Sequence, residues 1–499
     1  MAKKLSDFID LAADSQSKSK DLRTFLRQLV EHDRDQLLVV DREVDPVFEA
    51  TSIVDRIRSD SATYPKYPAV LFTNIKGSDI PCLINLHGEY ERLALSLDTD
   101  LQGMVEEFGR REAEQLPTKE VSPSEAPVKE VVLKGSDAKL SLLPILKHNE
   151  LDGGKYVTSA ISITKDPSSG RVNAGIFRAQ LHGEQEVNLM FGPYQTTAHI
   201  FREHADRGKK MEVAMVLGHH PGMLLAGTTN PPGVGGELEV AGSLMGDSLE
   251  VVPAETVDLM VPAGAEIVIE GVVDTDPSTF KDEGPFGEYP LYYTGTGPQP
   301  VVKVQAITMR RKPVYVGLFN ASPEHLALGG LARTGFVLSR VRDVVPNVAN
   351  VHLPLSGTAR MHAYISMRKI ADGEPHLAAF NLFAYNQATK HIWVVDEDID
   401  VTNEAEVMWA FATRFQADKD MVVINNSIGG WLNPPTYGYQ RDKKGSLETK
   451  LIFDCTRPLG MDREFPTPAG VPAEVKERMN PDDYVRSLSD AEYELFTEE

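Results

Sequence analysis

The stretch VNAGIFRAQL, residues 172–181, indicates the fold of the middle of the chain. Its β-branched and aromatic residues are typical of a strand, and Gly175 permits a bulge within it. Further strand-like stretches surround it at short intervals, with one predicted helix among them, TTAHIFREHADRG, at residues 196–208. Many short strands in succession favour a β-barrel or a sandwich. The other strand-like stretches are residues 155–164, 186–192, 211–218, 265–273 and 301–309.

Helices and strands alternate on both sides of this region, which predicts α/β domains there. Residues 19–33 are expected to form a helix whose apolar face is made of Leu22, Phe25, Leu26, Leu29 and Val30. A second helix is expected at residues 46–60, with Pro46 in its first turn, followed by short strands at residues 68–75 and 81–88. Later in the chain, helices are expected at residues 324–346 and 403–415, and strands at residues 351–370 and 391–401.

The chain is long enough for several domains, and we expect four parts. A stretch rich in Pro, Ser and charge at residues 114–130 is interpreted as a linker. The expected parts are an N-terminal α/β domain (1–125), a β domain (126–312), a C-terminal α/β domain (313–460) and an arm with a docking helix (461–499).

The net charge of −22 argues against nucleic acid as a partner, because binding a polyanion requires a basic surface. A small anion is not excluded, since a few arginines and backbone amides can bind a carboxylate or phosphate locally. No run of about 18 apolar residues is present and the N-terminus is polar, so we expect neither a membrane span nor export. Cys82 and Cys455 lack metal-site spacing and suit a reducing cytoplasm.

The stretch KDEGPFGEYP, residues 281–290, contains the acids Glu283 and Glu288. The glycines and the proline between them exclude a regular helix and predict a tight loop that can turn both acids towards one cavity. Two carboxylates held close together resist ionising at the same time, so one of them can retain a proton for acid catalysis. The alternative is an ordinary solvated acidic loop.

Arg178 lies in an otherwise apolar part of the stretch 172–181. It faces solvent, forms a structural ion pair or binds the carboxylate of a ligand. Asn173 lies five residues earlier, and in a regular strand this odd spacing would place the two side chains on opposite faces. Both can reach one cavity only if a bulge or a strand end lies between them.

Asn173, His199 and Glu237 form a scattered set of amide, imidazole and carboxylate groups. Such a set suits a divalent ion, Mn²⁺ or Mg²⁺, that bridges a phosphate, although a packed or capping histidine is the ordinary alternative for His199. The stretch AGTTNPPGVGGELEVAG, residues 226–242, offers backbone amides and hydroxyls for a phosphate but matches no known phosphate-binding motif.

Eight blocks of sequence, taken in order, resemble the UbiD family of decarboxylases, which use prenylated FMN. The resemblance covers roughly residues 20–460. The blocks are DGGKY (152–156), NAGIFRAQ (173–180), TAHIF (197–201), GGELEVAGSLMGDSLEVV (235–252), VPAGAEIVIEG (261–271), EGPFGEYPLYYTG (283–295), PEHLALGG (323–330) and VVDEDIDV (394–401). The resemblance implies an N-terminal α/β domain, a flavin-reductase-like split β-barrel and a C-terminal α/β domain that closes over the active site.

The resemblance also implies roles for individual residues. Arg178, Glu283 and Glu288 match the catalytic Glu–Arg–Glu set of the family, and Asn173, His199 and Glu237 match its metal ligands, with K⁺ expected near Glu237. The implied contacts of the prenylated FMN are Ser159, Asn173, Ile176, Phe177, Arg178, Gly227, Thr228, Thr229 and Glu237. The implied substrate pocket contains Phe319, His325, Leu328, Trp431 and Leu432.

The chain departs from the family pattern at three places. Ala198 stands where a glutamine often precedes the metal-binding histidine, and GTTN (227–230) replaces a Ser-Ser-Met-Pro-like phosphate segment. The lysine that reaches the phosphate in ferulic acid decarboxylases has no match in register, although Lys390 is near.

The resemblance implies a reversible decarboxylase for an aromatic or heteroaromatic acid of the indole, pyrrole, furan or phenolic type. A flavin prenyltransferase would supply the cofactor, and a cytoplasmic homodimer or homohexamer is expected. Three alternatives remain open at this point. They are a flavin-dependent oxidoreductase, a 3-polyprenyl-4-hydroxybenzoate decarboxylase of quinone biosynthesis and a metal- or phosphate-binding regulatory protein.

Overall fold

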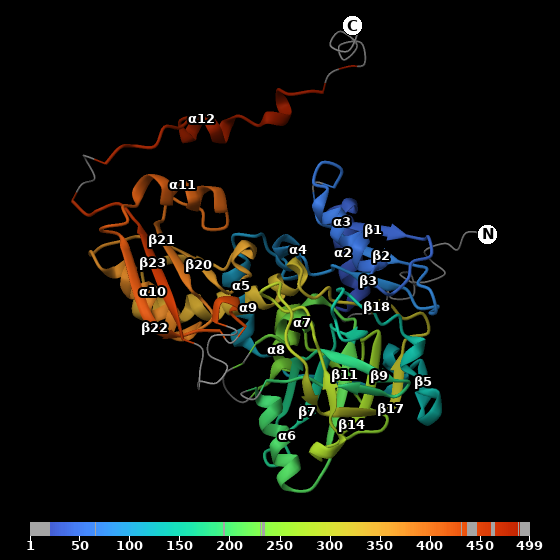
Figure 1. The fold of residues 1–499 in the computed structure, drawn as a ribbon. Helices are drawn as coiled ribbons and strands as arrows, with labels where there is room; N and C mark the ends of the chain where they lie inside the picture. The colour runs from blue at the N-terminus through green and yellow to red at the C-terminus, as the bar shows by residue number, and fades with distance from the viewer. Residues whose placement is uncertain are drawn as a thin grey trace. The chain divides into compact units, whose positions relative to one another are not determined.

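The computed structural model of the chain describes residues 20–64, 66–192, 195–229, 231, 235–430, 432–436, 447–460, 465–487 and 489. The chain divides into two compact units (Figure 1). The larger unit comprises residues 1–369 and 373–456, and the smaller one comprises residues 370–372 and 457–499. Within the smaller unit, the described residues form a short helix, α12 (Ala473–Arg478), and the 3-10 turn η10 (Pro481–Asp483). The described part of the predicted C-terminal arm therefore contains one short helix.

A nine-stranded sheet lies in the middle of the larger unit. Its strand order is β6-β9-β10-β17-β14-β11-β7-β8, and β5 pairs with β17. All strand-like stretches predicted for this region contribute to it, but residues 172–181 form two strands rather than one. The strands are β5 (Val131–Lys134), β6 (Tyr156–Val157), β7 (Ile161–Lys165), β8 (Val172–Ile176), β9 (Ala179–Gly183), β10 (Glu186–Asn188), β11 (Met211–Leu217), β14 (Ile267–Val273) and β17 (Val301–Met309).

β8 and β9 are consecutive in the chain but lie near opposite ends of this strand order. Only Phe177 and Arg178 separate them, and the three Cα–Cα steps from β8 to β9 reach at most about 11 Å. In a flat sheet the two strands would be six strand spacings apart, which is about 29 Å. The sheet therefore curls until its ends approach each other, and it forms a half-barrel (Figure 1).

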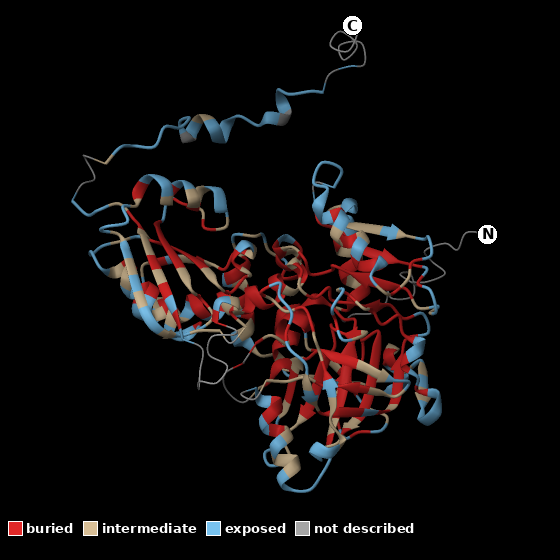
Figure 2. Cartoon of the chain, viewed as in Figure 1, coloured by how far each residue is buried: buried red, intermediate tan, exposed pale blue. Residues whose placement is uncertain are grey.

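Helices join this half-barrel to the rest of the larger unit. Helix α6 (Thr196–Asp206) contacts β7, β8 and β11, while α7 (Pro221–Ala226) and α8 (Glu237–Met245) pack on each other. Helix α8 also contacts α5 (Met104–Glu114), and α5 contacts α9 (Pro323–Val344). A continuous apolar core runs from the half-barrel through these helices into the sheet that follows them. The strands of the half-barrel are largely buried (Figure 2).

The N-terminal part of the larger unit contains a small sheet with the order β1-β2-β3-β18. Its last strand comes from far along the chain, after all the strands of the half-barrel. The strands are β1 (Leu37–Val40), β2 (Ala69–Phe72), β3 (Cys82–Ile84) and β18 (Tyr315–Val316), and the helices are α2 (Leu22–His32), α3 (Glu49–Ser59) and α4 (Tyr90–Ser96).

Two predicted details of this part are wrong. Val30 is 41% exposed, because it lies about 80° around α2 from Leu22, at the margin of the buried face. Pro46 is not in the first turn of α3, since that helix begins at Glu49, after Phe48 with its positive φ of 70°.

The C-terminal sheet of the larger unit has the order β19-β20-β21-β23-β22. β20, β21 and β23 are parallel, and β19 and β22 are antiparallel edge strands. The predicted alternation of helices and strands is therefore confirmed here. The elements are β19 (Val348–His352), β20 (His362–Met367), α10 (Glu374–Tyr385), β21 (His391–Asp396), α11 (Glu404–Arg414), β22 (Met421–Ile428) and β23 (Leu447–Cys455).

The stretch 114–130, predicted to be a linker, is instead packed into the larger unit. Strand β4 (Lys119–Glu120) pairs with β12 (Glu250–Pro253), which in turn pairs with β13 (Met260–Pro262). Ala126 and Val128 are buried in the apolar core, which is why the stretch does not behave as a free connection. Among the described residues, no helix combines the length and the apolar character needed to cross a membrane.

Candidate active site

A cavity of about 610 Å³ opens beside the crossing from β8 to β9. This volume lies within the range of sites that bind small molecules and cofactors. Its lining comes from the half-barrel, from α6 to α9 and from the C-terminal part of the larger unit. The predicted site residues that line it are Asn173, Ile176, Phe177, Arg178, Gly227, Thr228, Thr229, Glu237, Glu288, His325, Leu328 and Leu432.

Asn173 and Arg178 both reach this cavity because a strand end lies between them. β8 ends at Ile176 and β9 begins at Ala179, so Arg178 lies on the crossing rather than inside a regular strand. The sequence required a bulge or a strand end between Asn173 and Arg178 if both were to reach one cavity, and the structure has a strand end there. Gly175 lies within β8, where the register of the strand is continuous.

Arg178 is held by both acids of the stretch 281–290. Its Nε donates to Glu283 Oε1 at 2.8 Å, and its Nη2 donates to Glu283 Oε2 at 2.9 Å. Its Nη1 donates to Glu288 Oε1 at 2.7 Å, and the guanidinium lies 4.6 Å from the centre of the Phe286 ring. The loop therefore turns both acids onto Arg178, and the solvated-loop alternative is wrong, but only Glu288 also lines the cavity.

The loop that presents Glu288 is fixed by hydrogen bonds on both sides of Gly287. The Gly287 N–H donates to Asp152 Oδ1 at 3.0 Å, and the Gly287 carbonyl accepts from Asn320 Nδ2 at 3.1 Å. Glu283 precedes the loop at the end of β15 (Lys281–Glu283), where the Tyr156 hydroxyl donates to it at 3.0 Å. The sequence offered no signal for the roles of Asp152 and Asn320, since both lie far from the acids along the chain.

Burial and charge act in opposite directions on Arg178. Burial alone would lower the pKa of this guanidinium, but the hydrogen bonds and the charge of Glu283, with a contribution from Glu288, outweigh it and raise the pKa. Arg178 therefore stays charged in the cavity. With both acids ionised, the three side chains together carry a single negative charge.

His325 lies next to Glu288 on the cavity wall. Its Nε2 is 4.0 Å from Glu288 Oε2, and its Nδ1 accepts from the Ala321 N–H at 3.4 Å. Burial lowers the pKa of His325 to about 4, so the ring is neutral at physiological pH. Because Nδ1 accepts, the proton of the neutral ring is on Nε2, the atom that faces Glu288.

Asn173 and Glu237 form a second polar group in the cavity. Asn173 Nδ2 donates to Thr197 Oγ1 at 2.9 Å, and the Ala174 N–H donates to Glu237 Oε2 at 3.1 Å. Glu237 is buried, burial raises the pKa of its carboxyl, and no ion pair to it is found in the described part of the chain. A buried carboxylate beside amide and hydroxyl oxygens suits a divalent cation.

The structure does not bring His199 to this group. His199 is absent from the cavity lining, and its side chain is 60% exposed. It lies one turn after Thr196, but in this structure its side chain pairs with Glu203 rather than with Asn173 or Glu237. Thr196 and Thr197 are the residues of α6 that line the cavity.

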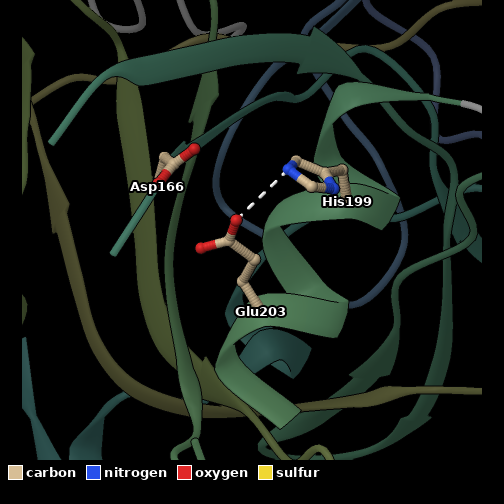
Figure 3. Close-up of side chains that lie close together, drawn as sticks. All are labelled: Asp166, His199 and Glu203. Carbon is tan, nitrogen blue, oxygen red and sulfur yellow. Dashed lines mark ion pairs between the residues drawn. The ribbon is translucent and has the colours of Figure 1, made fainter. Parts of the chain in front are cut away.

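His199 lies instead beside two surface acids (Figure 3). Its Nε2 is 3.3 Å from Glu203 Oε1, and candidate ligand atoms of His199, Glu203 and Asp166 all lie within 4.8 Å of one another. The Asp166 carboxylate already accepts the N–H groups of Ser168 and Ser169, and Glu203 accepts the Ser168 hydroxyl. These contacts account for the cluster as ordinary turn and helix-surface pairing.

Two further predicted residues lie just behind the lining. Ser159 is fully buried and its hydroxyl donates to the Val316 carbonyl, while its neighbour Thr158 lines the cavity. Phe319 is buried in the apolar core, while its neighbour Leu318 lines the cavity. Near the ends of strands, neighbouring side chains point to opposite sides, so a prediction displaced by one residue selects the wrong face.

Three other expectations have different outcomes. Glu283 is not part of the lining but holds Arg178 from behind, buried with 2% exposure. Lys390 donates to Asn433 Oδ1 at 3.3 Å and is not among the lining residues, so it does not supply the missing phosphate lysine. Trp431 lies outside the described residues.

Arg333 and Arg360 line the cavity and were not predicted from the sequence. Arg333 lies on α9, and Arg360 precedes β20. The Arg360 guanidinium lies 4.3 Å from the centre of the ring of Tyr289, the residue that follows Glu288 in the chain. Nothing in the sequence around Arg333 or Arg360 indicates that the two side chains line the same cavity.

Three family models match most of the chain. They are the N-terminal domain (residues 31–112), the Rift-related domain (119–323) and the C-terminal domain (326–455) of 3-octaprenyl-4-hydroxybenzoate carboxy-lyase, UbiD. The anhydromevalonate phosphate decarboxylase of Methanothermobacter thermautotrophicus is 31% identical, over 89% of this chain and 98% of that protein.

Solved structures of decarboxylases share the fold. The UbiD-class enzyme HmfF from Pelotomaculum thermopropionicum, in complex with FMN, is 38% identical with a TM-score of 0.85, over 93% of this chain and 100% of that one. An evolved dimeric form of HmfF, in complex with prenylated FMN, has a TM-score of 0.81 at 37% identity, over 94% and 100% of the two chains. The vanillic acid decarboxylase of Sedimentibacter hydroxybenzoicus is 30% identical with a TM-score of 0.81, over 92% of this chain and 97% of that one.

The matched domains cover most of the chain in the expected order, and the decarboxylase relatives match it over nearly their whole length. The chain therefore belongs to the UbiD family and is a carboxy-lyase.

Proposed function

We propose that this protein catalyses the reversible, non-oxidative decarboxylation of an aromatic or heteroaromatic acid with prenylated FMN. The observation that carries this proposal is Arg178, charged and held between Glu283 and Glu288 at the wall of a cofactor-sized cavity. The indole, pyrrole, furan and phenolic acids are the substrate classes considered. A long prenylated quinone precursor suits the site less well, because four charged side chains besides Glu237 line the cavity. Those side chains are Arg178, Glu288, Arg333 and Arg360.

The residues of the half-barrel end of the cavity suit the cofactor. Ile176 and Phe177 offer apolar surface for a ring system, and Gly227, Thr228 and Thr229 lie in the lining near its phosphate end. We infer that Asn173 and Glu237, with hydroxyls of α6 rather than His199, hold Mn²⁺ or Mg²⁺ on that phosphate, with K⁺ nearby. The middle region, residues 126–312, would then be a flavin-reductase-like split barrel between α/β domains at 1–125 and 313–460, followed by the arm at 461–499.

When bound, prenylated FMN supplies an electron sink, which an unsaturated acid lacks on its own. The protein then has to orient the acid and return a proton. Arg178 binds the carboxylate that is lost, and the carbon–carbon bond to that carboxylate breaks as CO₂ leaves. Glu288 gives its carboxyl proton to the carbon that has lost CO₂, so that the ring exchanges CO₂ for hydrogen.

The contacts of Arg178 explain how Glu288 acquires this proton. Nε and Nη2 of Arg178 donate to Glu283, and Nη1 donates to Glu288. A substrate carboxylate that binds Arg178 therefore competes with Glu288 for Nη1. A second anion beside an already negative set is unfavourable unless one acid is neutralised. Glu288 is the partner with a single bond to Arg178, so it takes up a proton from solvent water and releases Nη1, whereas Glu283 keeps its two bonds.

The test is a screen of aromatic acids for CO₂ release, with protein reconstituted with prenylated FMN. Glu288→Gln is expected to abolish CO₂ release and the exchange of the ring hydrogen with solvent, with cofactor content unchanged. Glu250→Gln, a substitution at a surface glutamate paired with Lys119, is the matched control and is expected to behave as wild type. Normal turnover by Glu288→Gln contradicts the assignment of the proton donor.

The proposal extends to the state of the protein in the cell. We infer a cytoplasmic homodimer or homohexamer whose cofactor is supplied by a flavin prenyltransferase. Mass spectrometry of the cofactor retained on purification and light scattering of the intact protein test these two points. If the protein retains unmodified FMN and NADH reduces that flavin, the alternative of a flavin-dependent oxidoreductase is favoured.

A further inference from the structure

Arg333 and Arg360 hold two positive charges at one place in the cavity wall. A Cβ built on Gly329, which also lines the cavity, would lie 2.8 Å from Arg333 Nη1 and closer still to Arg360 Nη2. The two guanidiniums therefore converge on the bare backbone of Gly329. No larger residue fits there without displacing them.

Neither guanidinium forms an ion pair with an acid in the part of the chain that the structure describes, although the charge of Glu288 favours the charged form of Arg360. Arg333 Nη1 donates to the Gly329 carbonyl at 2.7 Å, Arg360 Nη1 lies 3.4 Å from the Thr358 carbonyl, and Arg360 also stacks on Tyr289. The charge of Arg360, followed by burial, lowers the pKa of Arg333 to about 9. Two like charges kept together out of water are costly unless an anion joins them.

The position of this pair along the cavity separates it from the proposed phosphate end. His325, Gly329 and Arg333 are spaced four residues apart and lie on one face of α9. Arg333 therefore lies two helical turns beyond His325, the residue that contacts Glu288. The charge of Glu288 acts on Arg360, and the charges of Arg360 and Arg333 act on His325. The pair therefore belongs to the side of the cavity where Glu288 and His325 face the substrate.

We propose that Arg333 and Arg360 form a subsite for a second anionic group on the substrate, a carboxylate or a phosphate at the end opposite to the carboxylate that is lost. This inference rests on the proposed decarboxylation and narrows its substrate class to acids with two anionic groups. The group at Arg178 leaves as CO₂, and the group at Arg333 and Arg360 stays on the product, which keeps the product anchored for the reverse reaction. His325, neutral and with Nε2–H, can donate to the ring heteroatom or substituent between the two ends.

The experiment compares acids on the same ring with one or two anionic groups, by calorimetry on the protein loaded with prenylated FMN. The pairs are furan-2-carboxylic with furan-2,5-dicarboxylic acid and benzoic with terephthalic acid, and 4-phosphonobenzoic acid stands for a phosphate. We expect the diacid of at least one ring to bind at least about 30-fold more tightly than its monoacid, as the desolvated charge pairs of buried sites do. Preference for the phosphonate over terephthalic acid assigns the subsite to a phosphate, and the reverse assigns it to a carboxylate.

Three variants separate the subsite from other roles of the same residues. Arg333→Gln and Arg360→Gln are expected to abolish the preference for the diacid while monoacid affinity and cofactor content stay unchanged. Gly329→Ala is expected to do the same with both charges present, because its methyl group occupies the convergence point. Arg340→Gln, on the same helix but 42% exposed, is the matched control and is expected to retain the preference.

Two results would overturn the inference. Equal affinity of wild-type protein for monoacid and diacid on every ring would show that no second anion is bound. Loss of cofactor from the Arg333 or Arg360 variant, with the diacid preference retained, would assign the pair to the cofactor phosphate. Tight and selective diacid binding without any CO₂ release would instead keep the subsite and contradict the proposed decarboxylation.

Discussion

Glu283→Gln tests whether the buried pair with Arg178 stabilises the fold as well as the site. Glu283 is buried, and its two oxygens accept from Nε and Nη2 of Arg178. The substitution keeps the shape and one acceptor but removes a charge and one of two charge-assisted bonds. Removing one partner of a buried ion pair typically costs 3–5 kcal/mol, and Glu288 remains to neutralise Arg178, so we expect a cost near the lower end, about 3 kcal/mol.

The assay is urea unfolding of the purified protein followed by circular dichroism, read as the change in the free energy of unfolding. Glu250→Gln breaks an exposed pair with Lys119 at 2.8 Å and is expected to cost less than about 1 kcal/mol. Equal costs for the two variants would refute the reasoning, because burial is then not what makes the Arg178 pair strong. Turnover is expected to fall in Glu283→Gln only, since Arg178 loses its fixed orientation.

The other predictions concern the loop, the ion and the anion subsite. Asp152→Ala removes the acceptor of the Gly287 N–H and is expected to lower kcat about 100-fold with little change in KM. Asp152→Asn is expected to restore part of the activity. An unchanged kcat in Asp152→Ala would show that the loop needs no such support. Glu237→Gln is expected to lower bound Mn²⁺ measured by mass spectrometry of the metal, whereas His199→Ala is expected to leave it unchanged, and the opposite pattern would restore His199 as the ligand. The charge of Arg360, followed by burial, lowers the pKa of Arg333, so diacid affinity is expected to weaken towards high pH before monoacid affinity does, measured by calorimetry from pH 7 to 10. The charged and titratable groups that act on Arg333 or lie beside it are Arg360, Tyr289 and His325.

Much of the fold follows from local patterns in the chain. The strands of the half-barrel are runs of β-branched residues, and α2, α6, α9 and α11 have the apolar spacing of helices. The loop between Glu283 and Glu288 follows from its glycines and proline, which no regular element accommodates. These predictions succeed because the signals arise within a few residues of one another.

Local patterns did not reveal which side chains meet. Ser159 and Phe319 are each displaced by one residue from a lining position, and His199 is exposed and paired with Glu203 although it lies on the helix that lines the cavity. A step of one residue reverses the face near a strand end, and an exposed side chain on a helix can pair with a surface neighbour instead of entering the site. Small errors of register therefore move a predicted ligand out of the site.

By itself, then, the sequence determined the order of the elements, the acidic loop and the family. Tertiary structure alone decided that the sheet curls until the ends that carry β8 and β9 approach each other. It also brought Glu283 and Glu288, which lie more than 100 residues later in the chain, to Arg178. It also decided that Arg333 and Arg360 converge beside Gly329. The physical reason is that both juxtapositions depend on how sheets curl and helices pack, which no short stretch of residues encodes.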